Sequence, residues 1–103
     1  MKYLVSSVVG LILFSGVAGA EETIIRFGHF PNVTHAQGVI AHAFSRQGKG
    51  WFEERLGPGV KIEWYTYNAG PSAMEAIFAR SLDLTYVGPN PALNAHLKSN
   101  GAE

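Results

Sequence analysis

Cysteine is absent from the 103-residue sequence. Without a thiol, the chain can form no disulfide, no thiolate metal site and no cysteine nucleophile, and no lipid can be attached to a cysteine behind a signal sequence. The folded chain therefore has no disulfide to stabilise it. We expect neither a metal nor another cofactor from this composition.

No apolar run reaches the roughly 18 residues that a membrane-spanning helix needs. The longest candidate, Leu4–Phe14, follows the positively charged Lys2 and precedes the small residues of Ala18–Ala20. This order is typical of a secretory signal peptide with its cleavage site. We therefore expect residues 1–20 to be a signal peptide that is cleaved before Glu21; a retained membrane anchor is the alternative.

An excess of basic charge is also missing. The chain has eight Lys and Arg against eight Asp and Glu, and removal of Lys2 with the signal peptide leaves a net charge of −1. Such a balance offers nothing to hold nucleic acid or an acidic membrane surface. An exported protein without a lipid anchor would diffuse away from a single-membrane cell, so we favour the periplasm of a two-membrane bacterium.

What remains, residues 21–103, is short. A chain of this size buries only roughly 60–65% of its unfolded surface, which is marginal without disulfides. We therefore expect the natural folding unit to be larger than this chain.

Strand-like and helix-like segments alternate along residues 21–103. Three segments rich in β-branched, aromatic or alternating apolar residues are predicted strands: Thr23–Phe27, Val60–Tyr67 and Leu82–Val87. Val60–Tyr67 carries charged residues on one face, which suggests a position nearer the edge of a sheet. The sequence Trp51–Gly57 predicts one additional helical turn.

Each predicted strand is followed by signals for the start of a helix. Thr34 with Gln37, and Ser72 with Glu75, match the capping-box pattern. Asn90 suits the N-cap and Pro91 the first position of the last helix. The order β-α-β-α-β-α predicts an α/β fold with parallel strands and right-handed crossovers.

Three loops connect these strands to their helices, and in a parallel sheet all three lie at the same edge. They span Gly28–His35, Asn68–Ser72 and Gly88–Pro91, and none contains Asp, Glu, Lys or Arg. The N–H groups and dipole at the start of a helix favour an anion. One such loop is more often an ordinary turn, but three uncharged loops at one edge favour an anion-binding site.

Two other kinds of site are weaker alternatives. His35 and His42 are seven residues apart, roughly 10 Å along a helix axis, which is too far for both to bind one metal ion. A Ser-His pair such as Ser72 and His35 needs an orienting acid, and Asp83, the only Asp, lies at the start of a strand. His29 and His35 flank the first loop and suit neutral N–H donors to a ligand, whereas His96 is expected at the surface.

The segments "IRFGHFPNVTHA" and "VKIEWYTYNAGPSAMEAIFARSLDLTYVGPNPAL" resemble the substrate-binding proteins of ABC importers for nitrate, taurine and aliphatic sulfonates. The likeness extends from Ile24 to about Ala102, and its most specific parts are "AGPSAMEAI" and "GPNPA". It implies a type II periplasmic binding protein fold, in which two α/β lobes close on a small anionic solute and deliver it to an ABC transporter permease in the inner membrane.

The resemblance places the three βα units of residues 21–103 in part of the first lobe of such a fold. The second lobe of the family has no counterpart in this sequence, so a nonfunctional truncated fragment is one alternative. An enzyme on the same fold is another, although the related enzymes depend on cysteine. Carried over by position, the candidate ligand-binding residues are Asn32, Thr34, His35, Gly70, Pro71, Ser72, Gly88 and Asn90.

Overall fold

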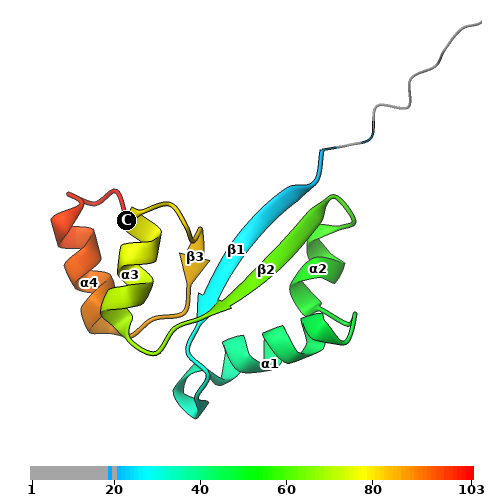
Figure 1. Ribbon diagram of the computed structural model, residues 1–103, viewed down its shortest axis with the longest axis horizontal. Helices are drawn as coiled ribbons and strands as arrows, with labels where there is room; N and C mark the ends of the chain where they lie inside the picture. The colour runs from blue at the N-terminus through cyan, green and yellow to red at the C-terminus, as the bar shows by residue number, and fades with distance from the viewer. Residues whose placement is uncertain (1–18, 20) are drawn as a thin grey trace, which may run out of the picture.

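The computed structural model describes residue 19 and residues 21–103 (Figure 1). The predicted signal peptide therefore lies outside the described residues, except for Gly19, and stays a prediction. The elements in chain order are β1 (Thr23–His29), the 3-10 helix η1 (Val33–His35), α1 (Ala36–Arg46), α2 (Trp51–Leu56), β2 (Val60–Thr66), α3 (Gly70–Phe78), β3 (Leu84–Thr85) and α4 (Pro89–Lys98).

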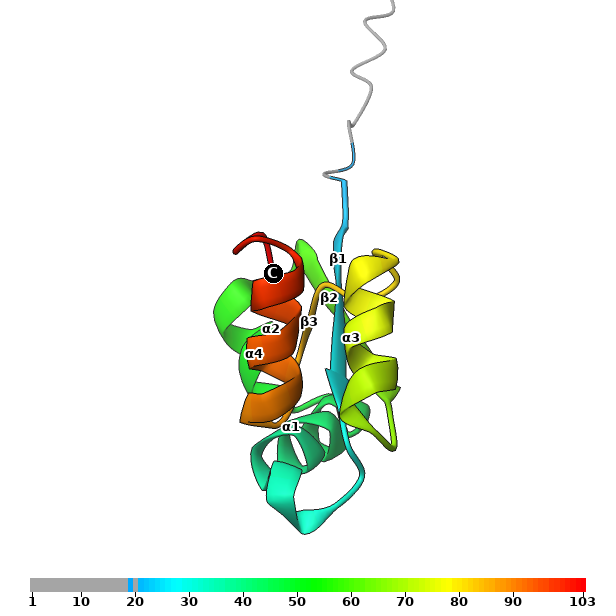
Figure 2. The same ribbon diagram turned by 90° about the vertical axis from the view of Figure 1, so that its left-hand side faces the viewer.

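The three strands form one parallel sheet in the order β2-β1-β3. The predicted α/β fold with three βα units is thus confirmed for residues 21–103, as is the position of β2 at an edge of this sheet. In Figure 2, α3 lies on one side of the strands, and α2 and α4 lie on the other. None of the described helices is long and apolar enough to cross a membrane.

Strand β3 is shorter than the predicted Leu82–Val87. Asp83 limits its N-terminal end, although the Asp83 N–H still donates to the Arg26 carbonyl at 2.9 Å. The backbone N–H of Arg26 donates to the Asp83 side chain, at 2.8 Å, and so does not bond a carbonyl of β3. The Arg26 guanidinium adds bonds from Nε to Oδ2 at 3.0 Å and from Nη2 to Oδ1 at 2.7 Å. Regular pairing therefore covers only Leu84 and Thr85.

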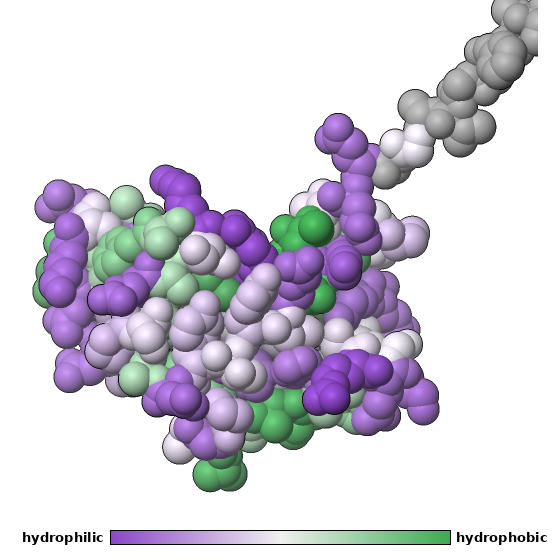
Figure 3. All heavy atoms as spheres, in the orientation of Figure 1, coloured by the Kyte–Doolittle hydropathy of each residue, from purple (hydrophilic) through white to green (hydrophobic). Residues whose placement is uncertain are grey.

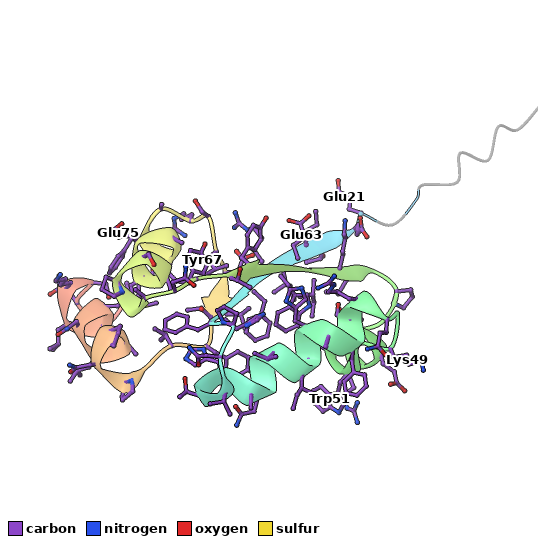
Figure 4. All side chains as sticks on the ribbon, turned by 60° about the horizontal axis from the view of Figure 1, so that its bottom comes forward. Glu21, Lys49, Trp51, Glu63, Tyr67 and Glu75 are labelled. Carbon is purple, nitrogen blue, oxygen red and sulfur yellow. The ribbon has the colours of Figure 1, made fainter. Side chains whose placement is uncertain are left out.

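An aromatic layer joins the sheet to α1 and α2 (Figure 4). Phe27 of β1 stacks on Trp64 of β2 with 4.7 Å between ring centroids, and Phe52 of α2 lies 5.5 Å from Phe27. Tyr86, just after β3, stacks on Phe27 at 5.2 Å. Side chains two residues apart on a strand share a face, so Phe27 and His29 both face this layer.

The apolar core of the described residues is small. Its buried members are Phe27, Ile62, Ala73, Leu82 and Ala95. Several larger apolar side chains stay exposed, among them Leu97 at 65% and Leu93 at 56%. Figure 3 shows apolar surface over α3 and α4 and along the side formed by α1. Burial of so few large side chains gives little stabilisation for a chain of this length.

The predicted starts are wrong by a few residues for the helices that follow the three strands, whereas α2 confirms the helical turn predicted at Trp51–Gly57. Asn32, not Thr34, caps the 3-10 turn that precedes α1, because its Oδ1 accepts the N–H of Thr34. Helix α3 begins at Gly70, so Ser72 lies inside its first turn and its hydroxyl donates to the Ala69 carbonyl. The two predicted capping boxes are therefore not formed.

Helix α4 begins at Pro89, with Gly88 rather than Asn90 as its N-cap. Proline favours the first helical position, since its fixed φ suits a helix and its missing N–H would be unpaired there. The chain offers two prolines for that position, Pro89 and Pro91, and the earlier one takes it. Asn90 consequently lies in the first turn.

Candidate functional site

The three strand-to-helix loops meet at one edge of the sheet, as predicted. In the register of the sheet, His29 lies opposite Thr66, and Gly28 lies opposite Thr85. Two backbone bonds tie the loops together beyond the strands: Tyr67 N–H donates to the His29 carbonyl at 3.0 Å, and Tyr86 N–H donates to the Gly28 carbonyl at 2.9 Å.

The starts of α3 and α4 touch each other at Gly70. A Cβ atom on Gly70 would lie 2.2 Å from Pro91 Cγ, so no larger residue fits without moving one helix. Gly70 is buried, and this predicted ligand-binding glycine thus has a structural role, since it lets the starts of α3 and α4 touch. A Cβ atom on Gly88 would lie 3.7 Å from Pro91 Cδ, an ordinary contact, so the space there does not require glycine.

Prolines reduce the number of N–H groups that these two helix starts present. Pro71, Pro89 and Pro91 carry no N–H. Among the described residues, the backbone N–H groups of Gly70, Ser72 and Asn90 make no hydrogen bond in the first turns of α3 and α4. These three donors, together with the positive ends of two helix dipoles, are what the second and third loops offer an anion.

The first loop differs from the other two because a side chain caps its 3-10 turn. Asn32 Oδ1 accepts both the Thr34 N–H at 3.1 Å and the Thr34 hydroxyl. The amide –NH₂ of Asn32 is left as a donor. This loop therefore adds a side-chain donor to the backbone N–H groups of the second and third loops.

His35 is the predicted ligand-binding side chain whose hydrogen bonding is best defined. Its ring is 8% exposed and stacks on Phe30, with 4.3 Å between centroids. The Phe30 N–H donates to His35 Nδ1 at 3.1 Å. Nδ1 must then be unprotonated in the neutral ring, so the proton is on Nε2. Nε2 bonds no described residue and keeps contact with solvent, so it is a free donor.

Exposed positions dominate the rest of the predicted set. Asn32, Thr34, Pro71, Ser72 and Asn90 are exposed to solvent. Pro71 and Asn90 line a depression of about 320 Å³ between α3 and α4, which Glu75 and Lys98 also border. The Glu75 side chain lies on α3, beyond the first turn (Figure 4). The loops themselves carry no charged residue.

The alternative sites find little support in the arrangement of the described residues. Both carboxylate oxygens of Asp83 bind Arg26, and the Ser72 hydroxyl donates to a backbone carbonyl. Ser72, His35 and Asp83 thus form no catalytic triad. No group of three or more His, Asp or Glu side chains within residues 21–103 is placed to hold a metal ion.

Sequence reasoning missed a pair of histidines beside the site. His29 Nε2 and His42 Nδ1 are 2.9 Å apart. The spacing of histidines along the sequence pointed only to His35 and His42 as a possible pair. The strand period already placed His29 on the same face as Phe27, but the contact with His42 depends on how α1 crosses β1.

Comparison with known proteins gives one partial similarity. A stretch of 46 residues is 37% identical to a protein of Bacillus subtilis (strain 168) described as "Putative aliphatic sulfonates-binding protein". The stretch covers 44% of this chain, and the chain spans 14% of the length of that relative. The likeness is therefore shorter than the expected Ile24–Ala102. No family model and no solved structure matches the chain.

Proposed function

We propose that this chain is part of an extracytoplasmic solute-binding protein that captures a small anion for an ABC importer. The solute would be an aliphatic sulfonate, taurine or nitrate, and the recipient an ABC transporter permease in the inner membrane of a two-membrane bacterium. Residues 21–103 would form part of the first lobe of a type II periplasmic binding protein fold. The role is binding and delivery, without chemical turnover.

One observation carries this proposal: uncharged loops at one sheet edge present unpaired donors in the first turns of two touching helices. Gly70, Ser72 and Asn90 supply backbone N–H groups, and His35 supplies Nε2–H. No carboxylate lies in these loops to repel an anion. The similarity to the Bacillus subtilis protein, whose description names aliphatic sulfonates, points to the same class of solute.

The expected affinity of the chain itself is low. Each helix start favours an anion by roughly 0.3–1 kcal/mol, up to about 2 when partly buried. Micromolar binding needs about 8 kcal/mol, and desolvation and ordering add their own costs. We therefore expect dissociation constants no better than about millimolar, with further contacts coming from a second lobe.

A ligand panel tests the proposal on the purified chain. Ethanesulfonate, taurine and nitrate should bind in titrations followed by NMR, at about millimolar to tens of millimolar concentration. Ethanesulfonamide has nearly the same shape without the negative charge, and it should bind at least tenfold more weakly. Equal binding of the sulfonate and the sulfonamide would contradict an anion site, and micromolar binding would contradict the need for a second lobe.

A further inference from the structure

Two imidazole rings make direct contact behind the first loop. His29 is at the end of β1 and is 3% exposed, and His42 is in the middle of α1 and half-buried. His29 Nε2 and His42 Nδ1 are 2.9 Å apart. Gly38 lets α1 approach this closely, since a Cβ atom there would lie 2.7 Å from His29 Cβ.

The surrounding bonds determine which nitrogen of each ring carries the proton. His29 Nδ1 is 3.0 Å from the Phe30 carbonyl oxygen, which can only accept, so Nδ1 must carry a proton. In the neutral ring, His29 Nε2 is then an acceptor. His42 must donate to it from Nδ1, at the 2.9 Å contact.

The His42 ring is suited to the neutral state. His42 stacks on Trp64, with 5.3 Å between centroids and 10° between planes. Burial, followed by the proximity of His29 and of Arg46, lowers the pKa of His42 below its usual 6.5. Of the other ionisable groups, Tyr86 and His35 border the same layer, Glu63 points away from α1 (Figure 4), and Glu53 is bound to Ser45. No described carboxylate bonds to the pair.

The pair is connected to the candidate site through Phe30. The Phe30 carbonyl accepts from His29, and the Phe30 N–H donates to His35 Nδ1. His35 in turn presents Nε2–H at the edge of the sheet. Each contact has a defined donor: His42 donates to His29, His29 donates to the Phe30 carbonyl, and the Phe30 N–H donates to His35.

Building on the proposed function, we propose that His42 is a positioning residue for the anion site. Its Nδ1–H donates to His29 Nε2 and so holds the His29 ring in place, the His29 Nδ1–H holds the Phe30 carbonyl, and the Phe30 N–H holds His35 as the Nε2–H tautomer. His42 itself does not touch the ligand.

Two substitutions separate positioning from simple packing. In His42→Asn, the side-chain amide keeps an N–H donor near the place of Nδ1, whereas His42→Leu removes it. Loss of this donor should weaken ethanesulfonate binding roughly threefold to tenfold, the effect of one hydrogen bond, and His42→Asn should recover most of it. His96→Leu is the control, because His96 is exposed and bonds only the Glu103 carbonyl.

The tautomers provide a readout that does not require a ligand. In ¹⁵N NMR of the imidazole rings of the full chain at pH 7.5, His29 should carry its proton on Nδ1 and His35 on Nε2. The Phe30 carbonyl keeps the proton on His29 Nδ1 in every variant, but His42→Leu leaves Nε2 without its donor, so the ¹⁵N signal of Nε2 should move toward that of an unbonded acceptor nitrogen and the His35 signals should broaden. His42→Asn should preserve the original pattern. If His42→Leu does not fold, His42→Asn alone decides by the same signals.

The outcomes are distinct for the two proposals. A His29 proton on Nε2 in the unsubstituted chain, or equal effects of Leu and Asn at position 42, would overturn the positioning role. If the His29 and His35 ring signals respond to substitution of His42 as expected but ethanesulfonate does not bind, the positioning chain is supported and the proposed ligand class is contradicted.

Discussion

Replacement of Asn90 by Asp adds one negative charge to the candidate site with almost no change in shape. Asn90 is exposed in the first turn of α4, where its backbone N–H is one of the unpaired donors. Asn94 is the matched control, because it lies one helical turn later, is also exposed and borders the same depression. Both substitutions exchange an amide for a carboxylate of the same size.

The charge that Asn90→Asp introduces has two effects of opposite sign. A carboxylate in the first turn should stabilise α4 by roughly 0.3–1 kcal/mol through the helix dipole. An anion about 6 Å away would be repelled by about 0.7–1.4 kcal/mol at an effective dielectric constant of roughly 40–80. Asn90→Asp should therefore weaken ethanesulfonate binding about threefold to tenfold while stability is unchanged or higher.

At Asn94, the added charge lies about 6 Å further along the helix axis. The repulsion falls to about half, and salt screens it further. Dissociation constants from NMR titrations, paired with urea unfolding, measure both quantities for both variants. Equal affinities for Asn90→Asp and Asn94→Asp, or no loss for Asn90→Asp, would refute the placement of an anion at the start of α4.

Three further outcomes follow from the structure. Gly70→Ala should lower the free energy of unfolding by about 1–3 kcal/mol in urea denaturation, because its Cβ would meet Pro91. Gly59→Ala should change little, because no atom lies within 4 Å of a Cβ there, and equal losses at both glycines would contradict the contact. Gly70→Asp would combine this collision with a charge effect, so Asn90→Asp is the better test of charge. Arg26 lowers the pKa of Asp83 from its usual 3.8 to about 2, so the ionised pair should stabilise the fold above pH 3.8 and lose that contribution as pH falls toward 2. Because the Asp83 side chain is 40% exposed, we expect about 1 kcal/mol after allowing for solvent screening, and Asp83→Asn should abolish this pH dependence; an unchanged pH profile would contradict the pairing. Mass spectrometry of exported protein should show a chain that begins at Glu21, and a chain that still begins at Met1 would contradict the predicted signal peptide.

The strands could be predicted from the sequence because they depend on local periodicity, and their parallel pairing followed from the alternation of strands with helices. Thr23–Phe27 and Val60–Tyr67 agree with β1 and β2 to within two residues. The short β3 was not predictable in the same way. Its length depends on the Asp83 side chain, which takes the Arg26 N–H that a longer strand would have paired. That contact joins residues 57 positions apart.

The candidate site was predicted in position but not in detail. Loops that follow parallel strands must share an edge, so their convergence followed from the fold class alone. The donors that each loop keeps free depend on which residue caps each helix. Asn32 already satisfies Thr34, and the start of α4 at Pro89 leaves one N–H, that of Asn90, in its first two positions. The chain of histidines behind the site depends on packing between α1 and β1, which no local pattern encodes.

A ¹⁵N-labelled sample of the chain, titrated with ethanesulfonate at constant ionic strength, tests the anion site most directly. We expect the largest amide shifts at Gly70, Ser72 and Asn90, with responses also from the side-chain amide of Asn32 and the His35 ring, and none from the turn at Gly59 at the opposite end of β2. Shifts centred at Gly59 or spread evenly over the chain would contradict the anion site, as would no shift up to about 50 mM, which is above the millimolar to tens of millimolar range expected for this chain.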